Sequence, residues 1–489
     1  MALSPRPADG QPIVFRNGIV LTMDDKHTVY KNADVLVIDD TIAEVGPQLQ
    51  VPEGTFEIDA KNGIVMPGMV DTHRHMWQTA MRGYGADWTL TQYFVWYYLQ
   101  YGKLFRPEDY WAGNAISALD AVESGITTTV DWSHGQRTVE HAEAAIDALV
   151  NAPGRYVMGF GNIFGGPWEW TADPAYRALI EKSQEDPRLL GVQLAFDVTG
   201  DPSFPERAAF EYAEERGIQV STHAGVWGAT NDEGVRLMYE NGFAHENTIY
   251  VHAATLSNDS YQRIAASGGS VSLATESEQS CGQGYPPSHA LRSHDIPVSL
   301  SMDTSVWFSA DLFAAMRATI GADRAWEHTN AHETGETVTH SHLRVEHVVD
   351  WATTGGAKAL GKDALIGSLE KGKKADVVLI KNEDSPTMTP IINPYGHVVM
   401  QANRGDVHTV LVDGKLKKFE NKLVDVDLAA VKAKLESTIE YLSSQMGEEQ
   451  WVKEQNPDIP ETKVLDNPYT YTEYRSDATH QAYETPVAE

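Results

Sequence analysis

Two histidines separated by one residue, His73 and His75, follow an apolar run that begins near Gly63. In an extended strand, residues i and i+2 point to the same side, so both imidazoles can face one point in space. Neutral imidazole is the commonest protein ligand for zinc and related ions. The pattern indicates a metal site at the tip of a strand, although two surface histidines in a loop would have the same spacing.

Three further residues of metal-ligand type close strand-like runs later in the chain: His223, His252 and Asp303. A single histidine of this kind is more often a core residue with its hydrogen bonds satisfied. Four histidines and an aspartate, each at the end of an apolar run, favour one convergent site.

The elements that must position these residues form a repeating pattern. From about residue 64 to 364, apolar strand-like runs alternate with helical stretches, which predicts βα units around a parallel sheet. Eight such units close into an α/β fold, the (β/α)8 TIM barrel, whose active site lies at the carboxyl ends of the strands. The predicted strands end near His75, Asp131, Phe164, Asp197, His223, His252, Glu276 and Asp303.

Strand-rich flanks on both sides of this middle region predict a second domain. We expect a discontinuous β-sandwich domain from residues 1–64 and 365–424, and the barrel from 65–364. Residues 425–489 are expected to form an amphipathic helix and an extended tail. The tail contains Tyr469, Tyr471, Tyr474 and Tyr483, which favours docking onto a partner subunit over full solvation.

Composition limits the class of protein. The net charge of −31 argues against nucleic acid and anionic membrane surfaces as partners, because both require a basic footprint. Cys281 is the only cysteine, so an internal disulfide is impossible and a reducing cytoplasm is the expected compartment. The aromatic helix and the tail suggest a homo-oligomer, either a dimer or a tetramer.

Three motifs carry a family resemblance over nearly the whole chain. The segment 67–75 resembles the opening signature of the amidohydrolase superfamily, in the branch of cytosine, guanine and S-adenosylhomocysteine deaminases and triazine hydrolases. Segments 353–361 and 366–376 resemble the family's return to its β domain.

The resemblance implies the roles of the convergent residues. His73, His75, His223 and Asp303 would bind the metal, and His252 would hydrogen-bond the water held by the metal or the substrate. Two-metal members usually carry a bridging lysine at the end of strand four, and the run 190–197 contains none. The sequence therefore predicts one divalent ion, with zinc favoured and iron or manganese as alternatives.

The chemistry that follows is hydrolytic. A bound ion lowers the pKa of water, Asp303 can accept its proton, and His252 can stabilise the developing charge. The related deaminases usually place a glutamate three residues after the strand-five histidine, where this chain has Val226. Glu276 is the preferred substitute for that glutamate, with Glu278 as a weaker candidate, and both could instead be loop carboxylates of an acidic protein.

Aromatic and polar residues near the first ligands are candidates for substrate contact. Trp77, Gln78 and Trp88 are preferred over the later tyrosines of the segment 88–105, whose helical spacing is also typical of a buried helix. His134, after the second strand, could bind substrate or cap the next helix.

These residues together predict a mononuclear metal-dependent hydrolase that cleaves a C–N bond of a nitrogen heterocycle or related small molecule. Deamination and ring opening both remain open. The alternatives are a metal-dependent lyase or decarboxylase on the same barrel, a dechlorinase-like hydrolase of a substituted heterocycle, and a binding protein without catalysis.

Overall fold

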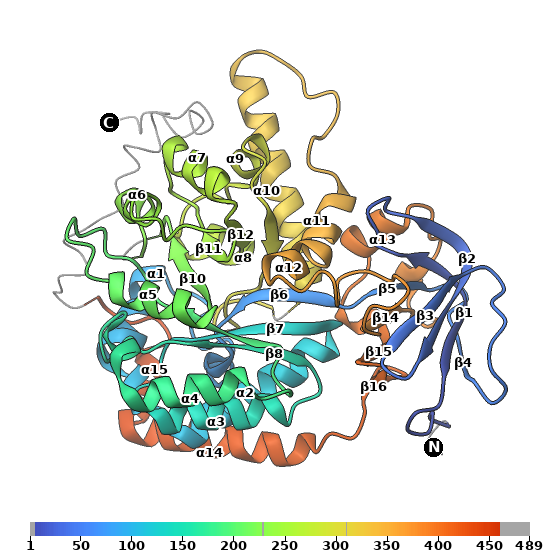
Figure 1. Ribbon diagram of the computed structural model, residues 1–489, viewed down its shortest axis with the longest axis horizontal. Helices are drawn as coiled ribbons and strands as arrows, with labels where there is room; N and C mark the ends of the chain where they lie inside the picture. The colour runs from blue at the N-terminus through green and yellow to red at the C-terminus, as the bar shows by residue number, and fades with distance from the viewer. Residues whose placement is uncertain (1–4, 227–228, 310, 460–489) are drawn as a thin grey trace.

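The barrel predicted from the sequence is the centre of the molecule (Figure 1). The computed structural model describes residues 5–226, 229–309 and 311–459, so the four tail tyrosines lie outside the described residues. Within these ranges, one parallel sheet contains eight strands in chain order. They are β6 (Met69–Arg74), β7 (Ile126–Ser133), β8 (Arg155–Phe160), β9 (Gly191–Ala195), β10 (Gln219–Ala224), β11 (Thr248–His252), β12 (Ser270–Leu273) and β13 (Val298–Leu300).

The first and last barrel strands meet at residues of metal-ligand type. The backbone N–H of Asp303 donates to the carbonyl of His73 (3.1 Å), and the carbonyl of Asp303 accepts from the N–H of His75 (2.8 Å). The α/β barrel and its strand order are therefore confirmed. Four strands end two or more residues earlier than expected: β8 ends at Phe160, β9 at Ala195 and β13 at Leu300, and β12 ends at Leu273 because helix α8 (Thr275–Cys281) begins directly after it.

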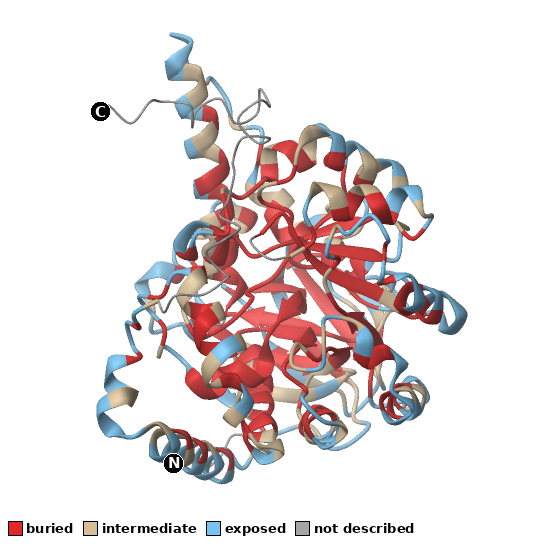
Figure 2. Cartoon of the chain, turned by 90° about the vertical axis from the view of Figure 1, so that its left-hand side faces the viewer, coloured by how far each residue is buried: buried red, intermediate tan, exposed pale blue. Residues whose placement is uncertain are grey.

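Helices surround the sheet, and Figure 2 shows that the strands are buried whereas the outer helix faces are exposed. The helices that follow the barrel strands are α2 (Pro107–Glu123), α3 (Val139–Val150), α4 (Pro174–Gln184), α5 (Arg207–Arg216), α6 (Asp232–Glu240), α7 (Asn258–Ser267), α9 (Ser288–Ser293), α10 (Leu312–Glu333), α11 (Val345–Trp351) and α12 (Thr354–Ala359). No helix among the described residues combines the length and apolar character needed to cross a bilayer.

Strands from both chain ends build the small β domain. Its nine described strands form one hydrogen-bonded sheet, in which β5 pairs with β1 on one side and with β14 on the other. The strands are β1 (Ile13–Leu21), β2 (Val29–Ile38), β3 (Thr41–Gly46), β4 (Phe56–Asp59), β5 (Ile64–Pro67), β14 (Val377–Ile380), β15 (Val407–Val412), β16 (Lys415–Phe419) and β17 (Lys422–Leu423). Only Gly68 separates β5 from β6, so the strand that carries His73 continues directly from this sheet.

Two regions outside the regular βα repeat approach the active end of the barrel. After β6 come the 3-10 turn η1 (Met76–Met81), α1 (Leu90–Phe94), the π-helical turn η2 (Val95–Gln100) and η3 (Gly102–Leu104). Near the end of the chain, α14 (Leu428–Met446) packs along α2 and leads to α15 (Glu448–Lys453). The remaining short elements are η4 (Glu169–Ala172), η5 (Pro386–Met388), α13 (Pro394–Met400) and η6 (Arg404–Asp406).

Candidate metal centre

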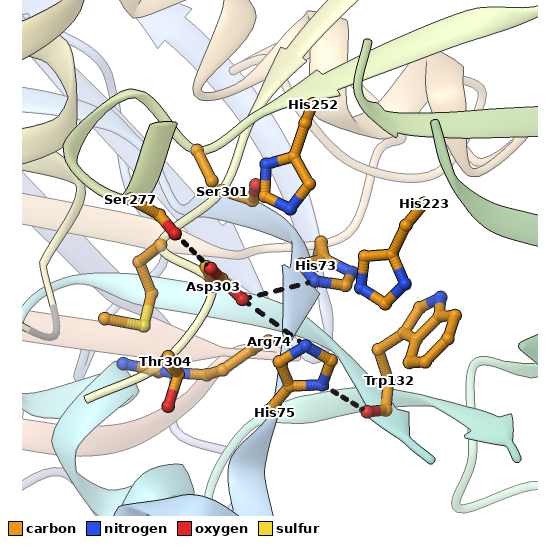
Figure 3. Close-up of polar contacts among 12 residues, drawn as sticks. His73, Arg74, His75, Trp132, His223, His252, Ser277, Ser301, Asp303 and Thr304 are labelled. Atoms are coloured by element: carbon orange, nitrogen blue, oxygen red, sulfur yellow. Dashed lines mark hydrogen bonds and ion pairs between the residues drawn. The ribbon is translucent and has the colours of Figure 1, made fainter. Parts of the chain in front are cut away.

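The barrel brings all five predicted ligand-type residues to one buried point (Figure 3). Donor atoms of His73, His223 and His252 lie within 4.8 Å of one another, and so do those of His73, His75 and Asp303. The Oδ1 atom of Asp303 lies 3.5 Å from Nε2 of His73 and 3.4 Å from Nε2 of His75. The residues come from β6, β10, β11 and the end of β13, which explains why they are far apart in the sequence.

Neighbouring oxygens orient three of the four histidine rings. His75 donates from Nδ1 to the carbonyl of Trp132 (2.8 Å), which turns its Nε2 towards Asp303. His223 pairs through Nδ1 with Asp197 (3.2 Å), and His252 pairs through Nδ1 with Glu278 (3.3 Å). An oxygen that accepts a hydrogen bond from one ring nitrogen fixes the tautomer of a metal-binding imidazole. The other ring nitrogen is then left to bind the ion.

The residues present fit a divalent metal ion. Nδ1 of buried His73 and Nε2 of His252 have no hydrogen-bond partner among the described residues. Buried polar atoms without partners are rare because their desolvation is costly. An ion bound by three imidazoles and a carboxylate that face one point would give these buried atoms a partner. This set of donors suits zinc, iron and manganese.

The electrostatics of the cluster favour the protonation states that metal binding requires. Burial lowers the pKa of His75 to about 4 and moves the pKa of His73 well below its ordinary value. Burial by itself would raise the pKa of Asp303, but hydrogen bonding to His73 and the nearby His75 and His252 outweigh it and hold that pKa well below its usual range. Neutral imidazoles and an ionised carboxylate are the forms that bind a cation.

Comparison with known proteins decides the family. Residues 64–417 match the model of the amidohydrolase family. The chain belongs to the amidohydrolase family. It is a metal-dependent hydrolase of C–N bonds, and the resemblance and enzyme class expected from the sequence are both confirmed.

Named relatives of this amidohydrolase include two kinds of deaminase. The 5'-deoxyadenosine deaminase of Methanosarcina barkeri is 24% identical over 427 residues, which cover 85% of this chain and 94% of the relative. The 5-methylthioadenosine/S-adenosylhomocysteine deaminase of Symbiobacterium thermophilum is 28% identical over 430 residues, which cover 83% of this chain and 93% of the relative.

Solved structures support the fold of the amidohydrolase. An adenosine deaminase from Xanthomonas campestris with bound zinc superposes with a TM-score of 0.74 at 21% identity, over 90% of this chain and 100% of that one. A triazine hydrolase from Arthobacter aurescens gives a TM-score of 0.74 at 20% identity, over 88% and 99% of the two chains.

A narrow cavity of about 20 Å³ opens beside the candidate metal centre of the amidohydrolase. His75, His223, His252 and Asp303 form its floor, and Val226 lies in its wall. The position at which related deaminases carry a glutamate therefore presents an apolar side chain to the site. The other described residues of the lining are Leu90, Tyr93, Phe94, Tyr98, Asp197, Ala229, Gln283 and Trp307.

Three of the residues expected to contact substrate lie behind this lining. Trp77 is buried and stacks on Tyr110, with ring centroids 4.8 Å apart. Gln78 donates to the hydroxyl of Tyr93 (2.7 Å), and Trp88 donates from Nε1 to the carbonyl of Glu454 (3.0 Å). None of the three is among the residues described as lining the cavity. The lining instead includes the later aromatic residues Tyr93, Phe94 and Tyr98.

His134 is also buried outside the lining. Its ring centroid lies 4.2 Å from that of His75, and its Nε2 lies 3.4 Å from the Tyr93 hydroxyl. His134 therefore contacts one ligand and one wall residue and is placed to support both.

The structure separates the two candidate carboxylates. Glu278 is buried against His252, whereas Glu276 is half-buried and accepts a hydrogen bond from Ser309 (3.4 Å). Neither residue is among those that line the cavity. Asp197 does line it, and the sequence reasoning named this aspartate only as a strand end, although that is the same signal that identified His223 and His252.

Glu276 should make stability depend on pH. Burial, with a smaller contribution from Asp311, raises its pKa to about 7. The folded chain then binds a proton that the unfolded chain releases above its ordinary pKa, so stability is lost as pH rises towards 7. After allowing for partial exposure, this loss is about 1–2 kcal/mol. Glu276→Gln should therefore melt about 1–3 °C above the parent at pH 8 and at the same temperature near pH 4. Calorimetry at both pH values checks this, and an equal difference at both would contradict it.

Residues 451–457 near the C-terminus support the aromatic wall, which consists of the cavity-lining rings of Tyr93, Phe94, Tyr98 and Trp307. Tyr84 donates to the carbonyl of Trp451 (2.6 Å) with the two rings 4.6 Å apart, and Gln92 donates to the carbonyl of Pro457 (2.9 Å). Tyr93 and Phe94 of α1 and Tyr98 of η2 lie in the lining of the narrow cavity. The packing of this segment thus sets the rest position of α1 and η2.

Removing that support should weaken substrate binding. Trp451→Ala is expected to raise KM about 3- to 10-fold with kcat and metal content unchanged, because the wall residues lose their fixed position. Val452→Ala is the matched control, since Val452 is 60% exposed on the same helix. Equal KM values for the two variants would show that the segment does not position the wall.

Proposed function

We propose that this amidohydrolase deaminates a nitrogen heterocycle, with one divalent ion, preferably zinc, held by His73, His75, His223 and Asp303. The observation that carries the proposal is the convergence of these four side chains at one buried point beside an aromatic-lined cavity. The deaminase names of the relatives support the reaction class, and flat rings such as Tyr98 and Trp307 suit a planar heterocycle.

When bound at these residues, the ion would supply Lewis acidity and lower the pKa of water to about 7. The Asp303 carboxylate accepts the proton of the attacking water and passes it to the leaving nitrogen. Because its Nδ1–H donates to Glu278, His252 has an unprotonated Nε2, which accepts a hydrogen bond from the attacking water and orients it. The aromatic wall excludes other water molecules from the reacting carbon.

Mass spectrometry in heavy-oxygen water tests the reaction. Metal-replete protein is incubated with aminopurines, pterins, aminopyrimidines, triazines and cyclic amides. Replacement of an amino group by a labelled hydroxyl is the expected result. Ring opening with gain of labelled water would replace deamination by cyclic amide hydrolysis, and loss of chloride would indicate a dechlorinase. Turnover without label would overturn the hydrolytic proposal in favour of a lyase.

We further propose that the enzyme works in the cytoplasm as a homo-oligomer. The single cysteine, Cys281, is buried, which suits a reducing compartment. Light scattering after size-exclusion chromatography should give a mass of at least two chains, and a monomer at micromolar concentration would exclude the oligomer.

A further inference from the structure

Helix α8 contacts both proposed catalytic side chains through two consecutive residues. Ser277 donates from Oγ to Oδ2 of Asp303 (Figure 3), and Glu278 accepts from Nδ1 of His252 at 3.3 Å. All four side chains are buried. One turn of one short helix therefore contacts the proton acceptor from β13 and the imidazole from β11.

The backbone holds the Glu278 carboxylate in place. The N–H of Ala274 donates to Oε1 of Glu278 (2.9 Å), the same oxygen that faces His252. Oε2 has no hydrogen-bond partner among the described residues, and the residue is 1% exposed. Burying a carboxylate is costly unless paired groups compensate for its lost hydration. A group kept at that cost beside the reacting centre is more readily explained by positioning than by stability.

His252 itself needs external support. Its backbone lies in the left-handed region with φ of 69°, and the next residue, Ala253, has φ of 55°. A residue other than glycine is strained in this region and persists there only where its surroundings determine its conformation. The pairing of Nδ1 with Glu278 selects one tautomer and one ring orientation, and it leaves Nε2, which has no partner among the described residues, for the centre.

We propose that Ser277 and Glu278 are positioning residues that together set the geometry of Asp303 and His252. This inference rests on the proposed function, since it assigns both targets a role in catalysis. It also gives Glu278, two residues beyond the expected Glu276, a defined place in the site: it acts through His252, not on the substrate.

Kinetics of α8 variants test the inference. Glu278→Ala should lower kcat about 10- to 100-fold, the usual loss when the outer partner of a site histidine is removed, with KM and bound zinc per chain unchanged. Glu278→Gln should stay within about threefold of the parent, because its amide oxygen accepts the same Nδ1–H. Ser277→Ala should also lower kcat, whereas Gln279→Ala, exposed on the same helix, is the matched control.

A second readout does not depend on activity. Nitrogen NMR of protein labelled only in histidine reports which ring nitrogen of His252 carries the proton. The parent and Glu278→Gln should show the Nδ1–H tautomer, and Glu278→Ala should show a mixture of tautomers. Full kcat in Glu278→Ala, an unchanged tautomer in that variant, or equal losses in the Ala and Gln variants would each overturn the positioning role. If the parent turns over no heterocycle, the proposed function fails, and the tautomer measurement still decides whether Glu278 orients His252.

Discussion

Asp303→Asn is expected to lower kcat by about 10²- to 10⁴-fold, the range for loss of a general acid or base. Oδ1 of Asp303 lies 3.5 Å from Nε2 of His73 and 3.4 Å from Nε2 of His75, and its proximity to His73, His75 and His252 keeps it ionised. Asparagine has the same shape and tolerates the left-handed backbone at this position, where φ is 60°. The variant should therefore fold normally and lose proton transfer. Steady-state kinetics with the substrate found by mass spectrometry give the value.

A matched control separates chemistry from backbone effects. Asp295→Asn makes the same change at an exposed aspartate with φ of 53° and should retain parental kcat. Bound metal is measured on both variants by plasma mass spectrometry. If Asp303→Asn keeps more than a tenth of the parental kcat, Asp303 is not the proton acceptor.

The second large effect is expected from loss of the metal site. His73→Ala, or treatment of the parent with a chelator, should lower activity at least about 10³-fold, since the ion supplies several kcal/mol of charge stabilisation. His73 is the residue shared by both groups of donor atoms, so its loss disrupts each of them. Zinc should restore the chelated parent and should not restore His73→Ala.

Thermal stability gives an independent measure of the same site. A ligand at a thousand times its Kd stabilises a fold by about 4 kcal/mol, so Tm of the parent should rise with added zinc. His73→Ala should show no such rise, whereas His340→Ala, on an exposed loop, should behave like the parent. A zinc-dependent Tm in His73→Ala would place the ion elsewhere.

The sequence predicted the barrel and the convergence of the ligands because both depend on local patterns. Each of His223, His252 and Asp303 follows an apolar run, and a parallel barrel brings such ends together whatever the intervening loops contain. Asp197 also follows an apolar run, the fourth, so the same pattern could have identified it as a carboxylate of the cavity.

Loop geometry was less predictable from sequence. Glu276 and Glu278 would point to the same side of a strand, but in helix α8 they differ by about 200° of rotation, so that one faces Ser309 and the other His252. Similarly, the π-helical turn η2 alters the helical spacing of the aromatic segment. Phe94 and Tyr98 line the cavity, whereas Phe105 is buried in the core.

The pairing of β5 between β1 and β14 has a consequence for biosynthesis. During translation, β1 to β5 leave the ribosome first, and β14, which begins at Val377, follows only after the entire barrel. Until then, one edge of β5 lacks its partner strand, and such an edge can pair with another chain. The small sheet is thus completed after the barrel. A chain truncated before Val377 would keep this edge of β5 unpaired and would be prone to aggregate.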